Sequence, residues 1–320
     1  MFPRWREDTM SMTPASPSGP AVPQRFADRH AAWLLRHSTP PPSLFHYTTA
    51  DGLLAMLRSR HLWATDSRFM NDPTELVYAA NLMRSEVESE LGRSGDPRKQ
   101  ELAAWIAAML EEKCQNARIY LACFCTDGDL LSQWRGYGSF GGGYAIGFNP
   151  LQLFGRDRHE LPPWRVLRQV VYDPDEQRTI LRGWIQELCA PGVDWRWQLE
   201  RNFPTLFSEW LVVFKDPSYR EEGEWRLIQF GREFEGDPSR GQLCWWWPTQ
   251  FRTRRGEVIP YADLDLTAAP AAAPAGPLIR DIVLGPTVER SRAEKALRLC
   301  TDLGGHPPPK FSVSKIPFVA

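Results

Sequence analysis

The sequence predicts an α+β protein with a mixed, mostly antiparallel sheet, helices packed on it and a single main core. Strand-like and helix-like segments follow one another without the regular alternation of parallel βαβ units. In runs such as residues 117–126, bulky apolar side chains alternate with other residues, and further runs carry β-branched side chains. Residues 98–113 instead repeat apolar side chains at helical spacing. A chain of 320 residues, 42% of them hydrophobic, is long enough to bury such a core.

The order of the expected elements supports this fold class. Thr49 or Asp51 is suited to cap the helix that follows the first strand, and Asp72 and Pro73 mark the start of the next helix. The expected strands cover residues 43–49, 61–66, 117–126, 141–150, 164–173, 221–230, 256–266, 278–286 and 310–318. The expected helices cover residues 25–37, 50–60, 72–83, 98–113, 177–190, 197–213 and 292–304.

Two segments have the composition of irregular chain. Residues 11–24 are rich in Ser, Pro and Ala, so we expect residues 1–24 to form a disordered leader. Residues 267–277 are rich in Pro and Ala and are interpreted as a linker or insertion. The domain prediction is therefore one α+β domain over residues 25–320 that contains this linker.

Charge and hydropathy exclude several classes of protein. The net charge is −1, with 38 basic and 39 acidic residues, which is not typical of a strongly basic nucleic-acid binder. No apolar run is long enough to span a membrane, and the N-terminal residues have no apolar signal-peptide core. We therefore expect a cytoplasmic protein with no membrane association.

The six cysteines are scattered along the chain. They form no CxxC pair and have no His at a metal-ligand spacing, so we expect reduced thiols and no metal site. The basic residues Lys215, Arg220 and Arg254–Arg255 are interpreted as a solvated rim.

His46 is the first candidate site residue. It lies between Phe45 and Tyr47 in a predicted strand, so its side chain points away from both, on the same side as Thr48. A hydroxyl donor beside an imidazole suits a polar ligand. A structural His in the core or at a sheet edge is the alternative interpretation.

Glu222 and Glu224 form the second candidate. If both lie in the predicted strand, period two places them on one face together with Arg226. One interpretation is a structural ion-pair network around Arg226. The other is a carboxylate that stabilises an oxocarbenium-like centre while its neighbour activates an acceptor.

The segment 132–138 is the third candidate. It places Trp134, Arg135 and Tyr137 close to glycines, so it is suited to stack an aromatic ring on a ligand and to offer a cation to phosphate. The alternative is a packed turn with Trp134 in the core. The glycines at 141–143 match neither phosphate-loop pattern.

Seven blocks follow one another in order along the chain, namely FHYTTADGLLAML, LWATDSRFMNDPTE, CFCTDGDLLSQWRGYG, GGYAIGF, FKDPSYREEGEWRLI, GEVIPY and IVLGP. Together, over about residues 43–318, they resemble the bacterial domain-of-unknown-function family numbered 2971. The resemblance implies membership of that family and no settled biochemistry.

The opening FHYT, followed by a helix and LWATD, is also similar to ADP-ribosyltransferases of the His-Tyr-Glu kind. That resemblance implies that His46 contacts the ribose of NAD, that Glu224 lies at the reacting sugar and that Glu222 lies on the acceptor side. Three tyrosines compete for the aromatic that stacks on nicotinamide, namely Tyr47, Tyr137 and Tyr144. Trp134 lies in the same region, and Arg135 would contact phosphate.

The leading hypothesis is therefore an ADP-ribosyltransferase-like enzyme or NAD glycohydrolase. NAD would be the co-substrate, no metal would be needed, and a protein or nucleic acid would be the acceptor. Such an activity would suit a toxin or defence effector. One alternative is a non-catalytic module that binds a nucleotide, a nucleic acid or a protein. A second is a metal-dependent hydrolase or nuclease that uses Glu75, Glu222 and Glu224.

Overall fold

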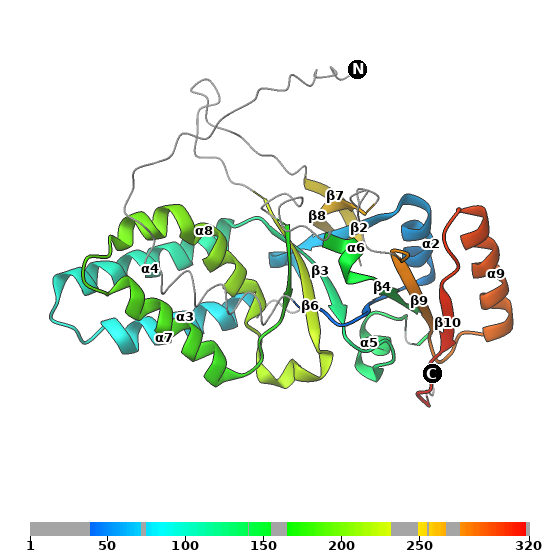
Figure 1. Ribbon diagram of the computed structural model, residues 1–320, viewed down its shortest axis with the longest axis horizontal. Helices are drawn as coiled ribbons and strands as arrows, with labels where there is room; N and C mark the ends of the chain where they lie inside the picture. The colour runs from blue at the N-terminus through cyan, green and yellow to red at the C-terminus, as the bar shows by residue number, and fades with distance from the viewer. Residues whose placement is uncertain are drawn as a thin grey trace, which may run out of the picture.

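The computed structural model of the chain (Figure 1) describes the following residues: 39–71, 75–139, 141–154, 165–231, 249–254, 256–266 and 276–317. The expected leader and the helix expected at 25–37 lie outside the described residues, as do Cys244 and residues 267–275 of the expected linker. Asp72 and Pro73 also lie outside them.

A ten-stranded, mostly antiparallel sheet organises the fold, with helices packed on it, so the predicted fold class is confirmed. The path of paired strands is β10-β9-β4-β1-β3-β2-β8-β7, and β6 connects β3 to β5. Among the strands that the structure describes, β9 and β10 alone pair in parallel. The strands are β1 (Leu44–Thr48), β2 (His61–Asp66), β3 (Ile119–Cys125), β4 (Tyr144–Phe148), β5 (Arg165–Gln169), β6 (Glu224–Phe230), β7 (Thr249–Arg254), β8 (Glu257–Asp265), β9 (Ile279–Leu284) and β10 (Lys310–Val313).

The sheet branches at β3. One edge of β3 pairs with β6 along its whole length, from Ile119 to Cys125. The other edge is shared by two strands, since β1 pairs at Cys125 and β2 pairs at Tyr120 and Leu121. The strands β1 and β2 therefore separate from each other beside the middle of β3.

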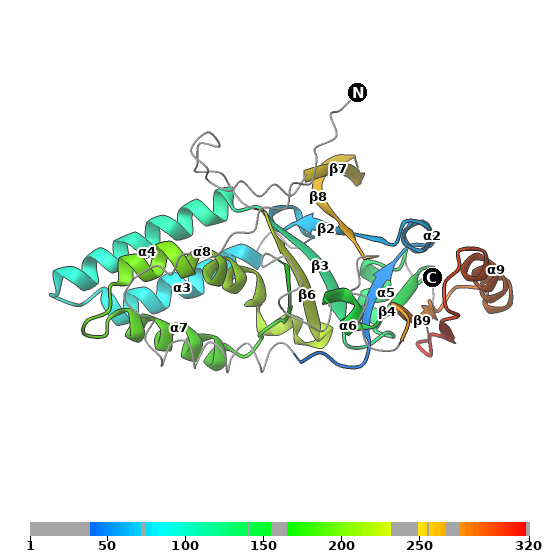
Figure 2. The same cartoon turned by 45° about the horizontal axis from the view of Figure 1, so that its top comes forward.

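The helices form two groups, which both views of the molecule separate (Figures 1 and 2). A bundle at one end consists of α3 (Glu75–Leu91), α4 (Pro97–Asn116), α7 (Pro174–Leu188) and α8 (Trp195–Val213). The other helices lie along the sheet, and they are α2 (Ala50–Ser59), α5 (Leu131–Gly136), α6 (Pro150–Phe154) and α9 (Arg290–Leu303). No helix among the described residues is long and apolar enough to cross a membrane.

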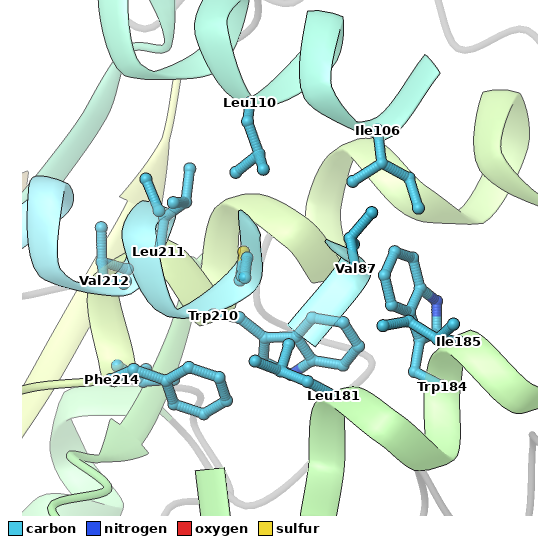
Figure 3. Packing of buried hydrophobic residues seen from close by; sticks show 14 of the residues in the cluster. Val87, Ile106, Leu110, Leu181, Trp184, Ile185, Trp210, Leu211, Val212 and Phe214 are labelled. Carbon is cyan, nitrogen blue, oxygen red and sulfur yellow. The ribbon is translucent and has the colours of Figure 1, made fainter. Parts of the chain in front are cut away.

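Buried side chains gather in three clusters around this sheet. The first fills the bundle and reaches Leu121 of β3 and Ile228 of β6, and Figure 3 shows its tryptophans packed among aliphatic side chains. The second lies on the opposite face of the sheet, under α2 and α9. The third is small and surrounds Trp134 of α5, against Tyr47 and Cys125.

Side-chain caps fix the starts of several helices. Thr49, one of the two expected caps, accepts a hydrogen bond from the backbone N–H of Gly52. Asp96 and Asp173 cap α4 and α7, each followed by a proline at the first helical position, where the absent N–H leaves no donor unpaired. The local sequence is therefore enough to start these helices.

Several local features differ from the expectations. The strand expected at 221–230 begins only at Glu224, because residues Pro217–Glu222 form a 3₁₀ helix, η2, that ends at Gly223. The segment 132–138, in which a helix start followed by a loop is expected, lies mostly in α5, so the helix is longer than expected. The strand β7 was not predicted, because its side chains show no clean alternation between buried and exposed positions.

Candidate functional site

Lys215 is the centre of a buried charge network that contains both candidate glutamates. Its Nζ donates to Glu222 Oε2 at 2.7 Å and to Glu224 Oε2 at 3.0 Å. Glu224 also accepts two hydrogen bonds from Arg226, at 2.8 and 2.9 Å, and Arg226 donates to the carbonyl oxygen of Val212. Lys215 was expected on a solvated rim, but it is only 5% exposed, because both carboxylates compensate its charge.

The turn at Gly223 explains how two glutamates from different elements reach one lysine. Glu222 ends η2, Glu224 begins β6, and Gly223 between them has φ +50°. A side chain there would also meet Thr126, whose Oγ1 lies 2.5 Å from an ideal Cβ position. The period-two strand geometry expected for Glu222 and Glu224 is therefore replaced by a tight left-handed turn.

The two carboxylates have opposite pKa shifts. Burial disfavours ionisation of Glu224, but the charges and hydrogen bonds of Arg226 and Lys215 outweigh it and lower the pKa to about 2. Burial raises the pKa of Glu222, and Lys215 opposes that shift only in part. Glu224 is 4% exposed and fully paired, whereas Glu222 is half-buried and its Oε1 accepts no hydrogen bond from a described residue.

Tyr137 extends this network toward solvent. Burial raises the pKa of its phenol to about 12, the Asn71 side chain lies within hydrogen-bonding reach, and the charges of Glu224 and Glu222 add to the rise. The Tyr137 side chain is nevertheless 43% exposed. It therefore stays a neutral hydrogen-bond donor at the accessible margin of the carboxylates.

His46 lies on β1, the strand that pairs with β3, and its Nδ1 is 2.9 Å from the carbonyl oxygen of Cys123. The ring is tilted over Phe124 and points away from the cluster of Tyr47 and Trp134, as strand alternation predicts. Burial lowers the pKa of His46, the bond to Cys123 opposes the shift, and the charge of Arg252 lowers it further. His46 is therefore neutral at pH 7 and donates its Nδ1 proton to Cys123.

Cys123 connects the imidazole with the carboxylates. Its carbonyl accepts from His46, while its thiol hydrogen-bonds to Glu224. His46, Cys123 and Glu224 belong to the adjacent strands β1, β3 and β6. The structure therefore brings the predicted His and Glu to one region of the sheet without direct contact between them.

Two of the candidate ligand-binding aromatics are packed into the fold. Tyr47 donates to the carbonyl of Asp127 and accepts from the N–H of Leu130. Trp134 is fully buried, its Nε1 donates to Asp129 at 2.8 Å, and its ring packs edge-on against Tyr47. Neither ring is free to stack on a ligand, which agrees with the packed-turn interpretation of this segment.

The remaining candidates lie around this centre. Arg135 is exposed and makes no hydrogen bond or ion pair with another described residue. Thr48 and Tyr144 are paired across β1 and β4, both half-buried, and Tyr144 packs against the second hydrophobic cluster. Of the three competing tyrosines, Tyr137 is thus the one beside the carboxylates.

The part of the chain that the structure describes contains no cluster of ligands that would support the metal hypothesis. No group of three or more His, Cys, Asp or Glu side chains is placed there to hold a metal ion. The side chain of Glu75 lies outside the described residues, so its place in that hypothesis stays a prediction.

Sequence reasoning missed two members of the centre. The sequence places Lys215 on a solvated rim and predicts only a reduced thiol at Cys123. Cys123 lies in the block CFCTDGDLLSQWRGYG, which also contains the predicted site residue Tyr137. Lys215 lies in the block FKDPSYREEGEWRLI, which also contains both glutamates. That co-occurrence was the available signal.

Comparisons with known proteins give one match. The family model described as "Protein of unknown function (DUF2971)" matches residues 133–227, so the resemblance expected over 43–318 is supported for that part. The matched part contains Tyr137, Lys215 and both glutamates, but not His46. No curated protein and no solved structure matches the chain, so the similarity to ADP-ribosyltransferases gains no support from them.

Proposed function

We propose that the chain is an enzyme that cleaves the N-glycosidic bond of NAD, with Glu222 as its catalytic residue. The observation that carries this proposal is the pair of carboxylates on Lys215, whose pKa values are shifted in opposite directions. Environments that separate the pKa values of two neighbouring carboxylates are typical of acid–base sites.

Cleavage of the N-glycosidic bond is favoured by a carboxylate next to the positive charge that develops on the sugar. The bond between ribose C1′ and the nicotinamide nitrogen breaks, its electron pair leaves with neutral nicotinamide, and the sugar becomes oxocarbenium-like. Water or another acceptor then forms a bond to C1′ and loses a proton. Glu222 is suited to take that proton, because its pKa is raised and its Oε1 is unbonded among the described residues.

The surrounding residues take supporting roles in this proposal. Tyr137, as an exposed aromatic donor, would contact the nicotinamide ribose. Glu224 would be a positioning residue, since it holds Lys215 and Lys215 holds Glu222. This differs from the sequence-based hypothesis, in which Glu224 itself lies at the sugar.

A second candidate is a non-catalytic nucleotide-binding module. It is favoured by the pairing of Glu224 with both Arg226 and Lys215, which is the pattern of a structural ion-pair network. In that case ligand binding at Tyr137 would not require Glu222 to exchange a proton.

The test is proton NMR of NAD incubated with the full chain, comparing wild type with Glu222→Gln and Glu221→Gln. Glu221 is the exposed neighbour in the same 3₁₀ helix and is the matched control. We expect nicotinamide release by the wild type, a fall of about 10²–10⁴-fold in Glu222→Gln, and no comparable fall in the control.

The alternative outcomes separate the candidates. An NAD-dependent rise in melting temperature without nicotinamide release, equal in Glu222→Gln, would favour the binding module. Equal release by wild type and Glu222→Gln would remove Glu222 from the mechanism.

A further inference from the structure

Arg252 of β7 is half-buried and lies in an environment that differs from that of the buried Arg226. Its guanidinium is stacked over Trp63 of β2 at 5.4 Å and near Tyr261 of β8 at 5.8 Å from the ring centroids. One Nη2–H donates to Thr65 Oγ1 at 2.7 Å. The two aromatic faces hold the cation in a fixed orientation.

The positive charge of Arg252 is not neutralised by an acidic side chain among the described residues. Its Nε–H is buried and makes no hydrogen bond with a described residue, and Thr65, its one hydrogen-bond partner within the described ranges, is neutral. Arg226 and Arg168, by contrast, are each paired with a glutamate. A half-buried guanidinium with an unused donor is costly unless an anion or water completes it.

A second cation lies nearby on the same strand. Arg254 donates to the carbonyl of Phe69. Burial lowers the pKa of Arg252, and the charge of Arg254 lowers it further. Trp63 beside Arg252 is 44% exposed, so this part of the sheet is open to solvent at the aromatic ring. Two like charges held close together are relieved by a bound anion.

We propose that Arg252, supported by Thr65 and Trp63, binds the phosphate group of a phosphorylated metabolite such as a nucleotide. A guanidinium recognises phosphate through parallel charge-assisted hydrogen bonds, and Arg252 has donors available for them. A phosphate would neutralise the charge that lacks an acidic partner among the described residues, with the terminal Nη1 hydrogens as donors, because the Nε–H itself is buried. This site lies on β2, β7 and β8, and it does not depend on NAD cleavage at Glu222.

The experiment measures binding of adenosine 5′-monophosphate, inorganic phosphate and adenosine by calorimetry and by the ¹H–¹⁵N signal of the Arg252 Nε–H. We expect the two phosphate compounds to bind and to shift that signal, and adenosine to do neither. In Arg252→Gln the affinity should fall about tenfold or more. Arg196→Gln is the matched control, because Arg196 also stacks on a tryptophan but is paired with Glu101.

The control variant should keep the wild-type affinity. If Arg252→Gln melts at a clearly lower temperature than wild type, Arg252→Lys takes its place in the test. The lysine keeps the charge but lacks the planar fork of the guanidinium, so this variant should bind phosphate more weakly than wild type. Binding of inorganic phosphate as tight as that of the nucleotide would mean that phosphate alone is recognised. Equal binding of adenosine, equal loss in Arg196→Gln, or no signal shift at about 10 mM ligand would overturn the proposal.

Discussion

The imidazole Nδ1 of His46 lies 2.9 Å from the carbonyl oxygen of Cys123, at the place where β1 and β2 separate beside β3. The paired positions of β3 on this edge are Cys125 on one side and Leu121 on the other, so Cys123 lies between the two pairing strands. The His46 side chain therefore donates to a backbone carbonyl of β3 at the point where the two neighbouring strands divide.

Removal of the Arg252 charge should raise the pKa of His46. Burial is the main reason that this pKa is low, and the guanidinium charge of Arg252 lowers it further. The variant Arg252→Gln removes only the second contribution, so we expect a partial return toward the ordinary value of 6.5. Titration of the His46 ring signals by NMR measures the shift. An unchanged titration would show that Arg252 does not act on His46, and Arg196→Gln is the control.

Truncation of Glu224 should destabilise the fold strongly. Glu224→Ala would leave Arg226 and Lys215, both nearly fully buried, without their shared carboxylate. Breaking a buried pair in this way costs about 3–5 kcal/mol. Urea unfolding would measure the loss. Glu294→Ala, which removes a surface ion pair of α9, should cost far less, and similar losses in both variants would contradict the structural role of Glu224.

The same group predicts how stability depends on pH. The pKa of Glu224 is about 2 in the folded chain, against an ordinary value of 4.5. Its contribution to the free energy of unfolding is complete above the ordinary value and is lost as the pH falls from about 5 toward 2. The free energy of unfolding, plotted against pH across this range, should therefore fall less steeply for Glu224→Gln than for wild type. Parallel curves would mean that other carboxylates cause the acid loss.

A side chain at Gly223 should disturb the turn that brings Glu222 and Glu224 to Lys215. Gly223→Ala adds the cost of a left-handed backbone, about 1 kcal/mol or more, and a close contact with Thr126. Gly192→Ala is the matched control, because φ is +77° there but no atom lies within 4 Å of the added carbon. We expect thermal unfolding to show the larger loss for Gly223→Ala. Equal losses of stability in the two variants would mean that the left-handed backbone alone causes the effect and that the contact with Thr126 adds nothing.

Asp129 should determine how firmly the C-terminal strand is attached. Its carboxylate accepts from Trp134 Nε1 at 2.8 Å, from Ser314 Oγ at 2.5 Å and from the N–H of Lys315 at 2.7 Å. Asp129→Ala leaves a buried indole donor unpaired, which costs about 1–3 kcal/mol. Hydrogen exchange at residues 310–315 should become faster than in wild type, and the exposed Asp51→Ala should leave it unchanged.

Much of the architecture was determined by the sequence alone. Apolar periodicity located β3 and α4, and Thr49, one of the two expected caps, lies where its helix begins. These features depend on residues within a few positions of one another, so a local pattern is sufficient to predict them. Strand alternation also placed His46 on the face opposite Tyr47, which the structure confirms.

Only the tertiary structure decided which candidate residues are accessible and which are structural. Trp134 and Tyr137 lie three positions apart in one segment, yet the first is fully buried and the second is 43% exposed. Lys215 became the centre of the charge network because the end of α8, the turn at Gly223 and β6 meet there, through contacts between separate elements. Burial and pairing across such contacts set the pKa of each carboxylate, and no local pattern contains that information.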